Sequence, residues 1–292
     1  MLDNMRMSVW AVAIMMAVGT TQSAPEPLAV VPPDATTRVS IDPNSVFYVA
    51  SRAGAFRLLS RPTALTSAPT EHEVHRAPPG TVVLSPALAP GGRRLYFESN
   101  ERTPSVAGRE DTDVWFVERK GQTWSAPRPL GTPFNTPYNE HSPTADAAGT
   151  ICFNSSRPGS EENDIYCGRV GASFPPERQT TLNSAAEDAT PWLSADGNVI
   201  VFTSNRSGGL GGWDLYVSHK AGGVWSAPRN LAAPINSSAD ELAVSLSSSG
   251  DYLYFFRPAD ASGPRRGYRV RFNGSVLARA GSDFPPPPSP SS

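Results

Sequence analysis

The chain has 292 residues, a formal net charge of −2 and 18% charged residues. This balance argues against a nucleic-acid partner, which would require a basic surface. The 30 Pro and 24 Gly residues interrupt regular structure too often for a mainly helical protein, although the length suffices for one or two domains with a sizeable core.

Residues 1–24 have the pattern of a cleaved secretory signal peptide. Arg6 gives a basic start, the apolar run 8–18 is short for a bilayer span, and small residues follow it up to Ala24. An uncleaved anchor and a buried helix are the alternatives. No cysteine follows the apolar run, so we expect no lipoprotein anchor. We therefore predict a periplasmic or secreted protein with no stable membrane span after cleavage.

Between the two ends, the chain repeats itself with a period of about 50 residues. Two near copies of one segment, GQTWSAPRPL at 121–130 and GGVWSAPRNL at 222–231, belong to a longer unit. This unit contains a turn residue, a short apolar run, a second run that begins with Asp, the Trp-Ser-Ala-Pro segment and a polar loop. The unit between the two copies carries Phe174 where they carry Trp124 and Trp225, and we expect Phe174 to fill the same structural position.

Each unit contains four short candidate strands that are rich in β-branched and aromatic residues. Such a unit is typical of a β-propeller blade, which buries its faces by stacking on neighbours in a closed ring. We predict an all-β protein, a β-propeller of four-stranded antiparallel blades over 39–282, with a strand from one terminus closing the ring. Residues 25–38 are expected to form a lead-in linker and 283–292 a disordered Pro/Ser tail. Five blades are favoured, with six as the alternative, by the turn residues Asn44, Gly92, Gly149, Gly197 and Gly250.

The repeated pattern Ser-x-Asp-Gly, apolar-x-Phe-x-Ser-x-Arg, then Asp-Ile/Leu-Tyr resembles the WD40-like (PD40) repeats of the TolB-type β-propellers. The resemblance is strongest over residues 85–258, whereas 55–58 and 267–270 lack the Asp. It implies the propeller fold, and a function like that of family members. These include periplasmic proteins that bind partners at the cell envelope, and propeller modules attached to peptidases or to peptidoglycan-binding domains.

Cys152 and Cys167 are the two cysteines of the chain. If Ser155 pairs with Asp164 in a hairpin, the two cysteines face each other on neighbouring strands. In an exported protein this arrangement favours a disulfide, with two free buried thiols as the alternative. Two Cys without a nearby His are too few ligands for a metal site, so we expect none.

Polar residues of the repeat are expected to fix its turns. An Asp just before a strand accepts backbone N–H groups and so holds a hairpin. Arg157 and Arg206 fall near the same turn, and we expect them to pair with these Asp residues. The expected structural aspartates are Asp113, Asp164 and Asp214.

Three acidic residues recur just before the innermost strand of a unit: Glu140, Asp188 and Glu241. In a propeller these positions surround one mouth of the central channel. There they are predicted to bind a cation or a basic segment of a partner. The alternative is that they cap turns and solvate the rim. Apart from such a channel cation, we expect no cofactor.

No catalytic constellation is found in the sequence. Gly-x-Ser-x-Gly, His-Glu-x-x-His and Walker patterns are all missing, so no catalytic residue is assigned and we expect a non-enzyme. The alternative is a sialidase-like glycoside hydrolase, because 121–125 resembles the tail of an Asp-box turn, or another secreted hydrolase. The main hypothesis is an exported, monomeric, non-enzymatic propeller that binds a protein or envelope component through one loop-rich face.

Overall fold

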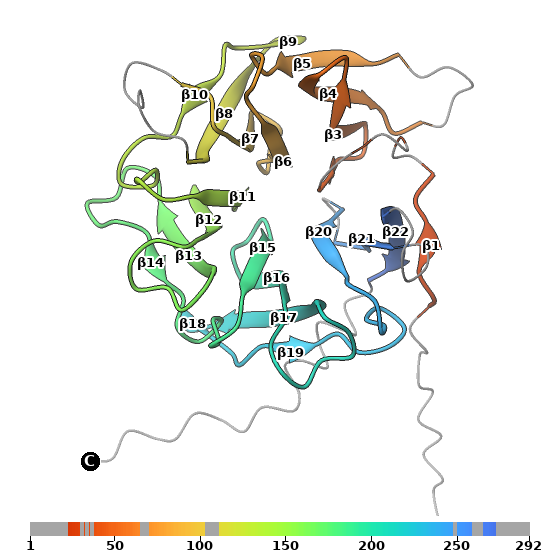
Figure 1. Ribbon diagram of the computed structural model, residues 1–292, viewed down its shortest axis with the longest axis vertical. Coiled ribbons are helices and arrows are strands. Elements are labelled where there is room, and N and C mark those ends of the chain that lie inside the picture. Colours follow the sequence, from red (N-terminus) through yellow and green to blue (C-terminus); the bar gives the residue numbers. More distant parts are fainter. Residues whose placement is uncertain are drawn as a thin grey trace, which may run out of the picture.

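The computed structural model is a ring of five antiparallel sheets stacked around a central axis (Figure 1). It describes residues 23–29, 32, 35, 38–64, 70–102, 111–247, 250–258 and 265–272, and these contain strands and no helix. The all-β fold with five four-stranded blades is therefore confirmed. The tail at 283–292 and the expected signal peptide, apart from residues 23 and 24, lie outside the described residues.

Blades 1 to 3 each run from an innermost strand beside the axis to an outermost strand at the rim. Blade 1 comprises β2 (Ser40–Ile41), β3 (Ser45–Arg52), β4 (Ala55–Pro62) and β5 (His72–Arg76). Blade 2 comprises β6 (Val83–Leu88), β7 (Arg94–Ser99), β8 (Asp113–Lys120) and β10 (Arg128–Pro129), with β9 (Thr123–Trp124) also paired to β8. Blade 3 comprises β11 (Glu140–Ala145), β12 (Thr150–Ser155), β13 (Asp164–Arg169) and β14 (Glu177–Arg178).

Blades 4 and 5 complete the ring. Blade 4 comprises β15 (Asp188–Leu193), β16 (Val199–Ser204), β17 (Asp214–Ala221) and both β18 (Val224–Trp225) and β19 (Arg229–Asn230) on its outer side. Blade 5 comprises β20 (Leu242–Leu246), β21 (Tyr252–Pro258), β22 (Arg265–Arg271) and β1 (Glu26–Pro27).

The ring closes through its N-terminal segment. Strand β1 adds to the rim of blade 5, where Glu26 lies opposite Arg269. The chain then reaches blade 1, where Ala35 bridges Ala50. The predicted closure by a terminal strand is confirmed, and the described ring starts earlier than the expected boundary at residue 39. The segment 25–38 shows no repeat pattern, and its pairing with blade 5 joins residues 243 positions apart, Glu26 and Arg269.

Aromatic side chains from the second strands fill the spaces between blades. Each blade is only one sheet thick, so it must bury both faces against its neighbours. The fully buried rings at the equivalent position of β7, β12, β16 and β21 are Phe97, Phe153, Phe202 and Phe255.

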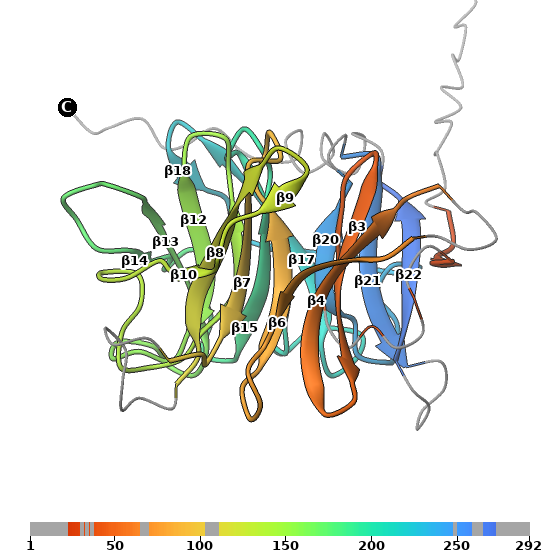
Figure 2. The same cartoon turned by 90° about the horizontal axis from the view of Figure 1, so that it is seen from above.

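The two faces of the ring differ in the length of their connections (Figure 2). We call the loop face the side that carries the longer connections 131–139, 156–163, 179–187, 205–213 and 231–240. We call the turn face the side that carries the connections 89–93, 121–122, 146–149, 170–176, 194–198 and 222–223, with the strand ends beside them. Within the described ranges, no helix is long and apolar enough to cross a membrane.

Candidate functional site: the axis and the loop face

A single arginine from the N-terminal segment lies at the axis of the ring. Arg38 is buried, and its guanidinium donates to Pro191 O at 2.8 Å, to Ser85 O at 3.5 Å and to Pro143 O. These carbonyls belong to the innermost strands of blades 4, 2 and 3. Burial lowers the pKa of Arg38 to about 10, which the carboxylate of Glu98 partly offsets, so the side chain stays charged at neutral pH. Arg38 thus places a positive charge at the axis of the ring. The sequence predicts a bound cation in the central channel as one use of the acidic residues.

Bulges in the innermost strands aim these carbonyls inward. The pairing register of the innermost strand shifts after Leu84, His141, Ala189 and Leu242. A bulge leaves one residue out of the ladder and bends the strand. The residue after each of these positions has a positive φ, between 46° and 57°: Ser85, Ser142, Thr190 and Ala243.

A histidine and a glutamate lie beside the axis in blades 2 and 3. His141 Nδ1 is 3.4 Å from Glu98 Oε2, and the same oxygen accepts the Ser142 N–H at 2.6 Å. Burial lowers the pKa of His141, but the hydrogen bond and charge of Glu98, with the charge of Glu140, outweigh it and raise that pKa above 6.5. His141 lies on the innermost strand of blade 3 and Glu98 on the second strand of blade 2, and the sequence pattern did not single out this ionisable pair.

The three acidic residues expected at the channel mouth are enclosed within the blades. Glu140, Asp188 and Glu241 are each 0% exposed. Burial raises the pKa of Glu140 and of Glu241, although hydrogen bonds and a nearby arginine oppose it in both cases. These three carboxylates therefore do not form an exposed acidic rim around the channel mouth. Their role in binding a cation or a basic segment stays a prediction.

Each of these carboxylates folds the loop that precedes it. Glu140 accepts the Thr136 N–H at 2.9 Å and the Thr136 hydroxyl at 2.5 Å. The same two bonds join Ser184 to Asp188 and Ser237 to Glu241. The residue before each of these hydroxyl residues is an Asn. Its side-chain oxygen accepts the backbone N–H of one residue of the third strand, and its side-chain nitrogen donates to the backbone C=O of the same residue. These Asn–strand pairs are Asn135 with Val114, Asn183 with Ile165, and Asn236 with Leu215.

The repeated arginines pair with these carboxylates, which corrects the expectation that they pair with the aspartates before the third strand. Arg157 Nη2 donates to Glu140 Oε1 at 2.9 Å and to Phe134 O at 2.7 Å. Arg206 bonds Asp188 and Leu182 O in the same way. Arg257 lies 3.6 Å from Glu241. Each guanidinium also stacks over two aromatic rings of its blade.

The aspartates Asp113, Asp164 and Asp214 are all buried at the start of a third strand. The Asp214 carboxylate accepts the N–H groups of Leu210 and Gly211. Asp164 accepts the Glu161 N–H at 3.1 Å and forms an ion pair with Arg178 at 2.6 Å. Asp164 and Asp214 therefore hold turns as expected, and the cationic partner of Asp164 is Arg178 of its own blade.

Blade 2 replaces the carboxylate–arginine pair with a different one. Val83 stands opposite Ser99, where Glu140 stands opposite Ser155 in blade 3. Glu101 takes the place of the arginine and pairs with His75 of blade 1, whose ring stacks on Phe97 at 5.9 Å. Blade 2 thus differs from blade 3 at both positions of the Glu140–Arg157 pair. Because both positions differ in the same blade, the sequence itself contains a signal that these two positions contact each other.

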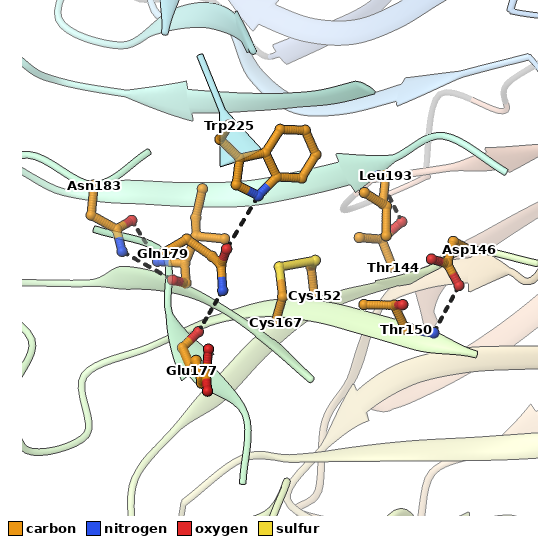
Figure 3. The surroundings of a disulfide bond; sticks show 11 residues. Thr144, Asp146, Thr150, Cys152, Cys167, Glu177, Gln179, Asn183, Leu193 and Trp225 are labelled. Carbon is orange, nitrogen blue, oxygen red and sulfur yellow. Dashed lines mark hydrogen bonds between the residues drawn. A yellow bond between two sulfur atoms is a disulfide. The ribbon is translucent and has the colours of Figure 1, made fainter. Parts of the chain in front are cut away.

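The predicted disulfide joins blade 3 internally. Cys152 lies opposite Cys167 in the β12–β13 ladder, and the two are bonded with their Cα atoms 4.1 Å apart (Figure 3). The register is the expected one, with Ser155 opposite Asp164. The alternative of two free thiols is not what the structure shows.

Among the described residues of the loop face, two large apolar side chains are exposed, Tyr138 at 41% and Leu210 at 52%; the turn face exposes Val170, Phe174 and Val224. Leu210 lies in the Gly-rich connection 205–213 of blade 4. A Cβ on Gly211 would lie 2.1 Å from Ala239 O, so only glycine lets this connection pack on the one that leads into blade 5. The loop is thereby held in place with Leu210 directed to solvent.

Comparisons with known proteins support the fold. No family model matches the chain, and no curated protein matches it. A solved structure of TolB from Acinetobacter baumannii is similar, with a TM-score of 0.53 at 15% identity over 80% of this chain and 53% of that chain. A putative TolB from Agrobacterium tumefaciens has a TM-score of 0.52 at 14% identity over 82% of this chain and 84% of that chain. The chain thus spans about half the length of the first of these proteins.

A puromycin-hydrolysing peptidase from Mycobacterium tuberculosis is also similar, with a TM-score of 0.48 at 16% identity over 85% of this chain and 38% of that chain. The five blades and the likeness to the two TolB structures define a five-bladed β-propeller with a TolB-like fold. At these identities the likeness is one of fold, and the neighbours include enzymes as well as TolB proteins.

Proposed function

We propose that this protein is an exported, non-enzymatic β-propeller that binds a protein or another envelope component through its loop face. The observation that carries the proposal is the presentation of Tyr138 and Leu210 on connections that buried polar networks hold in place. Large apolar side chains exposed on a rigid, otherwise polar surface are typical anchors of protein interfaces.

The fold and the sequence pattern support this location and role. The two TolB structures share the fold, and the repeats resemble those of the TolB-type propellers. The signal-like pattern at 1–24 supports export, and the Cys152–Cys167 disulfide is of a kind that persists in oxidising compartments. We place the protein in the periplasm or outside the cell, as a monomer.

In this proposal Glu140, Asp188 and Glu241 shape the binding face without touching the partner. Each carboxylate joins a hydroxyl residue of the loop to an arginine of the next strand or connection. A change at these positions would therefore alter the loops themselves, so a test of binding must use exposed residues.

The experiment is affinity capture from the envelope fraction of the native host with the mature chain immobilised. The informative variant is Tyr138→Asp with Leu210→Asp, and the matched control is Val224→Asp, which changes an exposed residue on the turn face. We expect the loop-face variant to lose a partner that wild type and control retain, with circular dichroism unchanged. Equal capture by all three would overturn the proposal, as would turnover of chromogenic glycosides or peptides that a single substitution abolishes.

A further inference from the structure

Near the turn face, a tryptophan is inserted between blades 1 and 2. Trp124 of blade 2 meets Phe47 of blade 1 edge to face, with ring centroids 5.8 Å apart. Leu88, the last residue of β6, packs against the same cluster. The guanidinium of Arg119 lies 4.6 Å from the Trp124 ring and covers its outer side.

The interface between blades 3 and 4 is built in the same way. Trp225 of blade 4 packs beside the Cys152–Cys167 disulfide of blade 3, and Leu193 belongs to the same cluster (Figure 3). Its indole N–H donates to Gln179 at 3.1 Å, and Lys220 lies 4.3 Å from the ring.

The interface between blades 2 and 3 has residues at the same positions as those that contact Trp124 and Trp225, but it has no tryptophan among its described residues. Tyr96 is the third residue of its strand, as Phe47 and Cys152 are of theirs, so the three positions are equivalent. Ala145 ends its innermost strand, as Leu88 and Leu193 end theirs. Ala145 is smaller than Leu, whereas Tyr96 is larger than Cys152, and both Tyr96 and Ala145 are buried at the base of the site.

Phe174 does not fill the position, which corrects the expectation from the sequence. Its side chain is 75% exposed. The connection between the equivalent pairs Phe116–Arg128 and Cys167–Glu177 is two residues shorter in blade 3. Blade 3 therefore has no counterpart of β9 or β18, the short strands that place Trp124 and Trp225.

A cleft of about 470 Å³ lies at this interface. It is large enough for an aromatic side chain and its neighbours, because small-ligand sites occupy about 300–1,000 Å³. Blade 2 contributes Arg93, Arg94, Tyr96 and Lys120 to its lining, among others, and blade 3 contributes Ala145 and Asp146.

The charges around the cleft favour an anionic occupant. Four cationic side chains face two carboxylates among the lining residues. Glu118 pairs with Arg94 at 2.9 Å, and Asp146 accepts the Thr150 N–H at 2.7 Å. Arg119 lies over Trp124, so the other two cations carry the charge that an occupant can meet. Arg93 and Lys120 are exposed at the rim.

The wall of the cleft also suits an aromatic ring. The guanidinium of Arg94 lies 5.1 Å from the Phe116 ring centroid and so presents a flat cationic surface. Guanidinium groups stack on aromatic faces. Cations already lie over Trp124 and Trp225 in the two filled sites.

We propose that the cleft between blades 2 and 3 binds an aromatic side chain flanked by acidic residues, presented by an extended segment of a partner protein. The partner's ring would take the position that Trp124 occupies between blades 1 and 2 and Trp225 between blades 3 and 4. Its carboxylates would pair with Arg93 and Lys120, since Arg119 already lies over Trp124. The cleft lies on the turn face, so this site is separate from the loop-face surface proposed above.

The test is the binding of acetyl-Asp-Glu-Trp-Glu-Asp-amide to the full chain, measured by calorimetry. We expect saturable one-to-one binding, at least tenfold weaker when Ala replaces the Trp of the peptide, and weaker at high salt. Equal binding of the two peptides would overturn the proposal in favour of a general anion site, and no binding of either would overturn it altogether.

Two variants locate the site. Ala145→Leu supplies the residue that packs with Trp124 and with Trp225 at the two filled sites. The fold should therefore accept it, and we expect the Trp peptide to bind within threefold of its wild-type affinity; loss of binding in a folded Ala145→Leu variant would contradict the assigned position of the ring. Arg93→Glu with Lys120→Glu changes exposed residues and is expected to abolish binding, whereas the control Arg265→Glu on blade 5 should retain it. Unchanged affinity in the Arg93/Lys120 variant would overturn the assignment even if Ala145→Leu failed to fold.

Discussion

Arg38 donates a hydrogen bond to the carbonyl of Pro191, a residue 153 positions later in the chain, at 2.8 Å across the axis of the ring. The same guanidinium reaches carbonyls of blades 2 and 3. One side chain of the N-terminal segment thus joins three other blades, while β1 of the same segment closes the rim of blade 5. The ring is held at its axis and at its rim by the same stretch of chain.

Replacement of Arg38 by Ala is expected to lower the free energy of unfolding by about 3 kcal/mol, because buried carbonyls lose charged donors. Arg38→Lys should lower the free energy of unfolding by less than Arg38→Ala does, since Lys supplies a cation but lacks the planar guanidinium with its several donors. Urea denaturation of the three proteins measures the difference. An unchanged midpoint for Arg38→Ala would show that the axis does not depend on this contact.

Glu140→Ala is expected to cost about 3–5 kcal/mol, because it leaves the buried guanidinium of Arg157 without its carboxylate. The control is Glu26→Ala, which removes the exposed partner of Arg269 and should cost less than about 1 kcal/mol. A double-mutant cycle of Glu140 and Arg157 by chemical denaturation should give a clear coupling energy. Additive effects of the two substitutions would contradict the assigned pair.

Removal of the disulfide by Cys152→Ala with Cys167→Ala is expected to lower stability by about 3 kcal/mol, the value for a closed loop of this length. The sequence separation of the two cysteines is 15 residues. The measurement is thermal unfolding with and without reductant. Reductant should lower the midpoint of the wild type and leave that of the double variant unchanged; an equal response of both would contradict a formed bond.

His141 is expected to make stability depend on pH. Its pKa is raised in the folded state, by Glu98 and Glu140 against the effect of burial, so the protonated form stabilises the fold. This contribution is fully present below the unfolded pKa of 6.5 and is lost as the pH rises through the higher folded pKa. The free energy of unfolding measured between pH ~6 and ~8 should fall less steeply in His141→Gln. Identical slopes would contradict this role.

The local parts of the architecture could be predicted from the sequence. The spacing of turn residues gives five blades, and the register of one hairpin places Cys152 opposite Cys167. The blade number and the hairpin register both depend on contacts within one blade. Because each blade repeats the same contacts, the residues that make them recur in the sequence at a fixed spacing.

The contacts between distant segments could not be predicted in this way. Arg38 lies in a stretch without periodicity, and its partners are set by ring closure. Arg157 is near Asp164 in sequence but bonds Glu140, because its side chain turns back toward the loop that precedes the blade. The exposure of Phe174 depends on a hairpin shortened by two residues, a change that sequence similarity to Trp124 conceals.

The central claim is that the loop face binds a partner, and crosslinking in living cells tests it most directly. A photoreactive amino acid is placed at Leu210 on the loop face or at Val224 on the turn face, both exposed positions of blade 4. We predict a discrete crosslinked product in the envelope from position 210 and none of the same mass from position 224. The same product from both positions, or none from position 210 in cells that contain the folded protein, would contradict the account.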